Sequence, residues 1–365
     1  MVIPPPPHWA RLLVQILWLP FVAVMTALCV PLLLIAVLLW PIDRRLRAAR
    51  VLALFLVFLW LDAGLVTGVF WIWARLSWRG EGRQSQAWRD EHEKLLLDAL
   101  DGFMEHAARW VGLRVEFEEP VDFGSEQTPL LVFARHAGPG DSVVLAWLLS
   151  AYAQRLPRIV LKDFLRWDPG IGALLYRLRA YFVPSRSGAG DDRARPVLEL
   201  SRSLERLDAL LLFPEGQNWT PTRWRASIRR LIDAGDLERA ALCESREHVL
   251  PPRARGVVTA MAERPDADVM IVAHTGLEWL VSPWHIFRAI PLHDHPFLLR
   301  AWTFAPSERP RDPEKIEAWL DAQWDVVNEW VGSHQEFEPE FPQGLRSRRG
   351  RRTGDRPRTD DGPTG

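Results

Sequence analysis

Cysteine and lysine are both scarce in this chain of 365 residues. Cys29 and Cys243 are too few for a disulfide framework and have no metal-ligand spacing. A reducing, cytoplasmic setting is therefore the simplest expectation for the globular part of the chain. Because lysine is so rare, nearly all of the 45 basic residues are arginine, the side chain suited to bidentate phosphate contacts. The formal net charge of -1 gives no indication of nucleic-acid binding.

Charged side chains are absent from residues 12–42. A helix of about 20 apolar residues spans a bilayer, so this run suffices for one crossing or for a broken hairpin kinked at Pro20 and Pro31. A second apolar run, residues 51–74, contains one charged side chain, that of Asp62. A signal peptide would be shorter and would not be followed by a second apolar run. We therefore expect residues 1–78 to form membrane-embedded helices.

Arginine clusters at 44–50 and 75–83 flank the second apolar run. The positive-inside rule places both clusters in the cytoplasm, which two simple crossings cannot achieve. The membrane topology therefore stays open: each apolar segment could cross the bilayer, or one of them could dip into it and return to the same side. We expect the chain at the cell membrane, integral or monotopic, with its globular part in the cytoplasm.

Beyond residue 86, short apolar runs alternate with helical patterns. The first helix is expected at 86–112 and the last at 313–331. The strands expected between them are 130–134, 158–161, 181–183, 209–213 and 269–273, and the helices are 142–155, 170–178, 195–207, 222–234 and 255–263. This order predicts an α/β sandwich with a largely parallel central sheet flanked by helices. We expect this domain to cover 79–340, and the Arg-rich residues 341–365 to be disordered.

A histidine and an aspartate follow the expected strand 130–134. His136 ends the strand, two glycines and a proline turn the chain, and Asp141 opens the next helix. Ligands of open α/β sheets bind beyond the carboxyl ends of the strands. A carboxylate that holds one ring nitrogen of a histidine lets the other take a proton, which makes His136 a candidate base. The alternative is a strand-end histidine with Asp141 acting only as a helix N-cap.

The segment Phe-Pro-Glu-Gly at 213–216 also follows an apolar strand and should line the same edge. Glu215 and Gly216 could position a substrate there, because glycine lets a ligand approach the backbone closely. Arg223, at the start of the next helix, could bind a phosphate through two hydrogen bonds. An ordinary turn followed by a solvated helix face is the alternative.

Three motifs together resemble the glycerolipid acyltransferase family, typified by lysophosphatidic acid acyltransferases. They are the HX4D motif from His136 to Asp141, Phe-Pro-Glu-Gly at 213–216 and Leu-Pro-Pro-Arg at 250–253, in the family's order and separation. The last motif, together with Gly256, most resembles the corresponding stretch in the branch of the family that contains lysocardiolipin acyltransferases. The resemblance covers about residues 10–335.

This resemblance implies a 1-acyl-sn-glycerol-3-phosphate (lysophospholipid) O-acyltransferase. Such an enzyme moves a fatty acyl group from acyl-CoA, or from acyl carrier protein, to a lipid hydroxyl without a covalent enzyme intermediate. The resemblance implies His136 as the base and Asp141 as the residue that orients it. The implied acceptor-binding residues are Glu215, Gly216, Arg186, Arg223 and Arg253. Membrane lysophospholipid and the acyl donor are the implied partners, with no metal and no cofactor beyond the donor.

Two departures from the family pattern concern the acceptor. Gln217-Asn218 replaces the family's Thr-Arg or Thr-Asp, and Arg186 lies one place later than the arginine of the family's Phe-(Ile/Val/Leu)-x-Arg block. Two alternatives therefore stay open. One is an acyltransferase acting on another acceptor, such as glycerol 3-phosphate or a glycolipid. The other is a non-catalytic lipid-binding protein with a degenerate acyltransferase fold.

Three further histidines are not expected to bind a metal. His293 and His295 lie in a Pro-rich loop with no third ligand apparent. His274 ends an expected strand and is interpreted as a core residue or a residue that supports the site.

Overall fold

The computed structural model describes residues 7–138, 140–178, 180–183, 195–278 and 283–334. Arg186 and the tail at 341–365 lie outside these residues.

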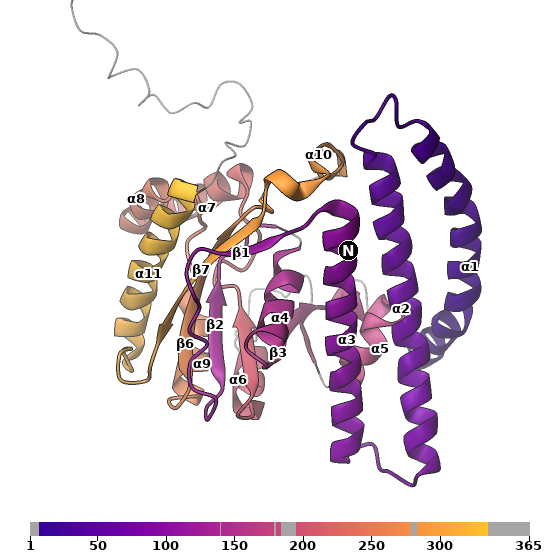
Figure 1. The fold of residues 1–365 in the computed structure, drawn as a ribbon. Helices are drawn as coiled ribbons and strands as arrows, with labels where there is room; N and C mark the ends of the chain where they lie inside the picture. The colour runs from indigo at the N-terminus through magenta and orange to yellow at the C-terminus, as the bar shows by residue number, and fades with distance from the viewer. Residues whose placement is uncertain (1–6, 139, 179, 184–194, 279–282, 335–365) are drawn as a thin grey trace, which may run out of the picture. The chain divides into compact units, whose positions relative to one another are not determined.

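Within the described residues, seven strands form one sheet in the order β1-β7-β6-β2-β5-β3-β4 (Figure 1). All neighbouring pairs are parallel except β6 and β7, which are antiparallel. The expected α/β fold with a largely parallel sheet is confirmed. The strands are β1 (Val115–Phe117), β2 (Leu130–Ala134), β3 (Leu156–Lys162), β4 (Tyr181–Val183), β5 (Asp208–Leu212), β6 (Asp268–Thr275) and β7 (Phe297–Phe304).

Helices cover both faces of this sheet. Side chains of β2 alternate between the two faces: Leu131 and Phe133 pack with residues of α6, α9 and α11, whereas Leu130 and Val132 pack with residues of α3 and α4. The helices are α1 (His8–Leu38), α2 (Arg47–Trp78), α3 (Gln86–Val111), α4 (Asp141–Ala151), α5 (Ile171–Arg177), α6 (Arg195–Ser203), α7 (Pro221–Asp233), α8 (Leu237–Ser245), α9 (Ala254–Glu263), α10 (Pro283–Ala289) and α11 (Pro313–His334), with short 3-10 helices η1 (Asp163–Trp167) and η3 (Leu292–Asp294).

Several element boundaries differ from the expected ones. The helix expected at 142–155 ends at Ala151, because the chain turns at Gln154 with a positive φ of 52°. The helix expected at 195–207 ends at Ser203. Strands β1 and β7 and helices α8 and α10 were not predicted. The three residues of β1 are too few to give a pattern, and β7 is interrupted by Arg300.

The two N-terminal helices are long and apolar. Both α1 and α2 have the length and composition to cross a membrane, and α1 includes Pro20 and Pro31 without a break. In the most apolar 18-residue stretch of each helix, 17% of the residues are buried within the protein in α1 and 28% in α2. The remaining apolar side chains, such as Ile16, Leu38 and Phe70, are exposed. This surface is suited to contact with lipid.

Asp62 is a buried carboxylate in the middle of α2, only 2% exposed. It accepts hydrogen bonds from the backbone amides of Gly170 (3.2 Å) and Ile171 (3.0 Å), at the start of α5. A Cβ atom on Gly170 would overlap this carboxylate, so the glycine permits the contact. Asp62 therefore attaches the α5 segment to α2.

Substitution Asp62→Ala should destabilise the chain, because it leaves the amide of Gly170 without its acceptor, whereas the amide of Ile171 keeps Oδ1 of Asp168 at 2.8 Å. We expect the free energy of unfolding to fall by about 1–3 kcal/mol, measured by thermal denaturation in detergent. The exposed Asp98, paired with Lys94 within α3, provides the control, since Asp98→Ala should cost less than about 0.5 kcal/mol. Equal losses in the two variants would contradict the anchoring role.

Candidate active site

Three loops meet beyond the carboxyl ends of β2, β5 and β6. The amide of Trp219, in the loop after β5, donates to the carbonyl oxygen of His136, after β2, at 2.6 Å. Gly138 approaches the loop after β6 so closely that a Cβ atom would lie 2.5 Å from the carbonyl oxygen of Leu277. A side chain at position 138 would force these loops apart. The motifs that the sequence singled out are thus brought to one edge of the sheet.

His136 and Asp141 are in direct contact. The Nδ1 atom of His136 lies 3.0 Å from Oδ2 and 3.1 Å from Oδ1 of Asp141. The imidazole also stacks on Phe213, with ring centroids 4.3 Å apart. Since the carboxylate engages Nδ1, Nε2 is the ring nitrogen that can exchange a proton with a substrate.

Asp141 is completely buried and yet remains ionised. Burial alone would raise the pKa of its carboxyl. The hydrogen bond with His136, the nearby His274 and the amide of Gly138 outweigh burial and hold the pKa below its ordinary value. The amides of Ala137 (2.7 Å) and Ser142 (2.8 Å) also donate to it. This carboxylate is therefore a fixed negative charge beside the imidazole.

A second buried layer supports this pair. The Nε2 atom of His274 lies 2.8 Å from the carbonyl oxygen of Arg135 and 3.8 Å from Oδ2 of Asp141. Burial lowers the pKa of His274, which favours its neutral form. The buried Arg135 donates to Glu278 at 2.7 Å and to the carbonyl oxygen of His248 at 3.0 Å. His274 thus supports the site, as interpreted from the sequence, whereas Arg135 and Glu278 were missed.

Glu215 is part of the loop after β5, and it is only 1% exposed. Burial raises the pKa of its carboxyl to about 8, although the positive charge of Arg135 opposes the shift. The structure does not place this side chain on the wall of the cavity described below. Its position is that of a residue which holds the loop rather than one which touches a ligand.

Gly216 has a φ of 70°, in the left-handed region that favours glycine. A Cβ atom here would approach the Nη1 atom of Arg253 to 3.1 Å, so the glycine makes room for that guanidinium. Arg253 is attached to the same loop by its amide, which donates to the carbonyl oxygen of Pro214 at 2.9 Å. Arg223 contacts the loop through a bond from Nη1 to the carbonyl oxygen of Asn218 at 3.0 Å. Two of the three expected phosphate-binding arginines therefore border one loop.

His136 lines an apolar cavity of about 560 Å³. Phe213, Ser142 and Asn218 line it beside the imidazole, and most of the remaining wall is hydrocarbon. The apolar wall comes from α2 (Phe58, Leu61, Leu65), α3 (Leu96, Ala99, Leu100, Phe103), α4 (Val143, Ala146), α5 (Ile171, Leu175) and β3 (Ile159, Val160, Leu161). A base on the wall of such a cavity can act on a polar group attached to a long apolar chain.

Residues 113–274, which carry the paired side chains and both loop motifs, match the family model described as Acyltransferase. These residues are therefore an acyltransferase domain. An uncharacterized acyltransferase of Schizosaccharomyces pombe is 22% identical to it over 209 residues, which are 53% of this chain and 56% of the relative. The chain thus spans about half the length of the curated relative it matches.

The fold of this chain is similar to that of a solved enzyme. The match is the 1-acyl-sn-glycerophosphate (LPA) acyltransferase PlsC of Thermotoga maritima, with a TM-score of 0.50 and 17% identity. It covers 80% of this chain and all of that one. At this identity the likeness concerns the fold alone.

Asp141→Asn should abolish most of the acyl transfer expected of this chain without unfolding it. An amide cannot hold a positive imidazole as a carboxylate does, so we expect kcat to fall roughly 10³- to 10⁴-fold. The measurement is acyl transfer by purified protein, with the melting temperature followed in parallel. Asp233→Asn, on the exposed part of α7, is the control and should retain full activity. An active Asp141→Asn variant would exclude an orienting role for the carboxylate.

Stability should depend on pH through Glu215. Between the ordinary pKa of 4.5 and about 8, the folded chain keeps a proton on Glu215 that the unfolded chain has lost. Wild-type stability should therefore decline as pH rises through this window, and Glu215→Gln should remove a decline of a few kcal/mol. Melting temperatures between pH 5 and pH 9 measure this difference. The exposed Glu238→Gln is the control and should follow the wild type; an identical profile for Glu215→Gln would show that Glu215 is ionised in the fold.

Proposed function

We propose that this chain is a lysophospholipid O-acyltransferase that transfers a fatty acyl group from a thioester donor to a lipid hydroxyl, with 1-acyl-sn-glycerol 3-phosphate as the acceptor. The observation that carries the proposal is the His136–Asp141 pair on the wall of the apolar cavity. The donor is acyl-CoA or acyl carrier protein. No cofactor beyond this donor, and no metal, is part of the proposal.

The reaction proceeds in two proton transfers. Nε2 of His136 removes the proton of the acceptor hydroxyl as its oxygen attacks the thioester carbonyl, and Asp141 stabilises the imidazolium that forms. The tetrahedral intermediate then collapses, the carbon–sulfur bond breaks, and His136 returns the proton to the departing thiolate. The products are an ester and a free thiol, and the imidazole is neutral again. No group of the protein is acylated in this sequence.

The cavity supports this chemistry because it can hold the acyl tail. Hydrocarbon buried against Leu100, Phe103 and Ile159 leaves water, which contributes about 0.8 kcal/mol per methylene group. The same burial keeps water away from the thioester, which limits hydrolysis.

The acceptor phosphate is assigned to Arg253 and Arg223, which border the loop at 213–220. Arg186, the third expected residue, lies outside the described residues. In this proposal Glu215 and Gly216 act by shaping the loop that carries these arginines. Asn218 lines the cavity where the family usually has a charged residue, an observation that favours a second candidate acceptor with less phosphate charge, such as a glycolipid.

The helices α1 and α2 are proposed to hold the enzyme at the cell membrane, with its α/β part in the cytoplasm. Lysophospholipids reside in the bilayer, so an enzyme attached there meets its acceptor at high local concentration. Both helices are long enough to cross, and their exposed apolar side chains suit a lipid environment.

His136→Ala should remove acyl transfer while the protein stays folded and membrane-bound. We expect at least a roughly hundredfold loss of kcat/KM, measured with radiolabelled acyl-CoA and lysophosphatidic acid. His285→Ala, an exposed histidine on α10, should retain activity. Near-wild-type activity of His136→Ala would refute the mechanism.

Arg253→Ala should weaken binding of a phosphate-bearing acceptor. Losing a charge-assisted contact raises KM for lysophosphatidic acid by about ten- to a hundredfold, with a smaller effect on kcat. Arg255→Ala, an exposed arginine two positions later in α9, is the matched control. The measurement is a panel of lysophosphatidic acid, glycerol 3-phosphate, a lysoglycolipid and lysocardiolipin. An unchanged KM for every phosphate acceptor would remove Arg253 from the acceptor site.

A further inference from the structure

Arg135 is a completely buried arginine that directly precedes the candidate base His136 in the chain. Its Nη1 atom lies 2.7 Å from Oε1 of Glu278, in the loop after β6, and the side chains of this pair are 0% and 3% exposed. The amide of Arg135 donates to the carbonyl oxygen of Val272 at 3.1 Å, which attaches the residue to β6 as well. An almost fully desolvated ion pair therefore lies beside the candidate active site.

Stability alone does not account for this ion pair. Moving a guanidinium and a carboxylate out of water costs a large free energy of desolvation, and their mutual attraction offsets that cost only when the geometry is good. Apolar side chains of similar volume often fill such a space with equal or greater stability. The contacts that the guanidinium makes beyond Glu278 point to another role.

On one side Arg135 fixes the loop after β6. Its Nη1 atom also donates to the carbonyl oxygen of His274 at 2.9 Å, and Glu278 accepts a hydrogen bond from the amide of Gly276 at 2.6 Å. The Nε2 atom of His274 in turn donates to the carbonyl oxygen of Arg135 at 2.8 Å. Because these bonds run in both directions, the backbone at Arg135 cannot shift without moving that loop.

On the other side Arg135 reaches the segment that carries Arg253. Its Nε atom donates to the carbonyl oxygen of His248 at 3.0 Å. The amide of His248 donates to Oδ1 of Asn328, in α11, at 3.0 Å, so the backbone of this residue is held from two directions. The prolines at 251–252 stiffen the remaining path to Arg253, since each fixes its own φ angle. A displacement of the guanidinium would therefore be passed on to Arg253.

The loop after β5 is the third one that Arg135 contacts. The guanidinium carbon lies 5.9 Å from the ring centre of Trp219, a cation–π contact. The amide of Trp219 donates to the carbonyl oxygen of His136, and the amide of Arg253 donates to that of Pro214 in the same loop. One buried side chain thus contacts every loop that meets at the candidate active site.

We infer that Arg135, paired with Glu278, is a positioning residue that fixes the base His136 relative to Arg253, the arginine assigned to the acceptor phosphate. The inference rests on the proposed function. A base can take the proton of the acceptor hydroxyl only if the phosphate of the same molecule is held at the right distance from it. Arginine suits this role because its five N–H donors lie in one rigid plane and can bond several loops at once.

The first test removes both charges together. Arg135→Met alone would leave Glu278 as an uncompensated buried charge, whereas Arg135→Met combined with Glu278→Met leaves none and should fold. With palmitoyl-CoA and lysophosphatidic acid as probes, we expect kcat to fall about 10- to 100-fold, because a misplacement of about 1 Å suffices for such a loss. The KM for the donor should not change, since the apolar cavity is intact. Wild-type kcat in a folded double variant would overturn the inference.

A double-mutant cycle with Arg253→Ala separates positioning from a general loss of structure. If Arg135 acts by holding Arg253 in place, both changes disrupt one arrangement. The combined loss of kcat/KM should then be at least about fivefold smaller than the product of the separate losses. Losses that multiply would overturn the inference, because they would show that the two sites act independently.

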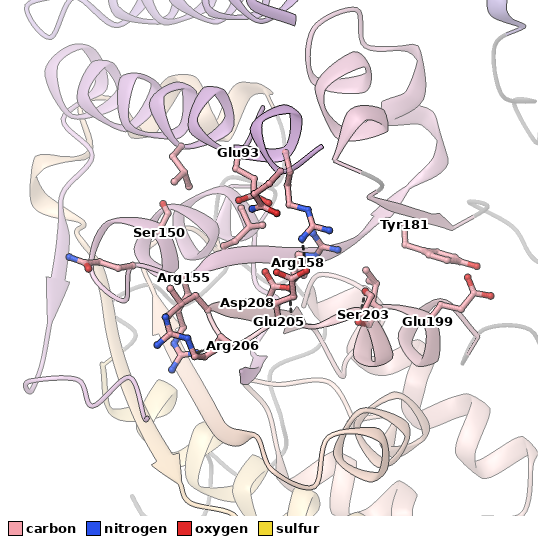
Figure 2. Close-up of a pocket in the computed structure, with 17 residues that line it drawn as sticks. Glu93, Ser150, Arg155, Arg158, Tyr181, Glu199, Ser203, Glu205, Arg206 and Asp208 are labelled. Carbon is pink, nitrogen blue, oxygen red and sulfur yellow. Dashed lines mark hydrogen bonds and ion pairs between the residues drawn. The ribbon is translucent and has the colours of Figure 1, made fainter. Parts of the chain in front are cut away.

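Arg155 provides the matched control. It is 2% exposed and donates to the carbonyl oxygens of Thr128 at 2.9 Å and Ser125 at 2.6 Å. Figure 2 shows it in a polar cavity of about 810 Å³ near the start of β3 and β5, at the opposite ends of the strands from the candidate active site. Arg155→Met should lower the melting temperature and change kcat by less than about twofold. A loss of kcat as large as that of the double variant would contradict a specific role for Arg135.

A second variant covers the case in which the double variant fails to fold. Arg135→Lys keeps a positive charge beside Glu278 and loses the Nε donor to His248, so it releases the segment that carries Arg253. We expect a similar loss of kcat, and an unchanged kcat in folded Arg135→Lys protein counts against the inference. If the wild type transfers no acyl group to any acceptor, the proposed function fails. If it is active and neither variant lowers kcat, only the positioning role fails.

Discussion

The contact between His136 and Asp141 requires a carboxylate that is both ionised and entirely removed from solvent. Burying an isolated charge would cost a large free energy of desolvation, so the surrounding structure is arranged to stabilise this carboxylate. Backbone amides of the turn donate to it, and the imidazole of His136 contacts both of its oxygen atoms. The turn can adopt this shape only because Gly138 admits the carbonyl group of Leu277. The geometry of the His136–Asp141 pair is thus set by three strands whose ends meet at one edge.

The His136–Asp141 pair and the apolar cavity belong to different parts of the fold. The pair and the residues that support it lie on the loops that follow β2, β5 and β6, which are the most deeply buried strands of the sheet. The cavity lies instead between β3 and the helices α2, α3, α4 and α5. A rigid core can therefore fix the reacting groups while the surrounding helices determine the size and shape of the substrate. Such a division allows related chains to keep one reaction and change its substrate.

The sequence predicted what is local or strongly periodic. Strands β2, β5 and β6 are mostly apolar because both faces of each strand are covered. Such a run can be recognised in the sequence alone. His136 and Asp141 are five residues apart, so a single turn brings them together. Arg135 and Glu278 are 143 residues apart, and only the pairing of β2 with β6 creates their contact. The burial of Glu215 was equally hidden, since a carboxylate in a turn ordinarily faces solvent.

The contribution of α2 to the cavity has a practical consequence. Phe58, Leu61 and Leu65 belong both to the apolar helix and to the wall around the substrate space. A soluble fragment prepared by deleting the first two helices would lose one side of that space, and with it the enclosure of a bound tail. Detergents used for extraction carry alkyl chains of similar character, so they can occupy the same volume and act as competitors. Nanodiscs or lipid vesicles are for this reason the better medium in which to study turnover.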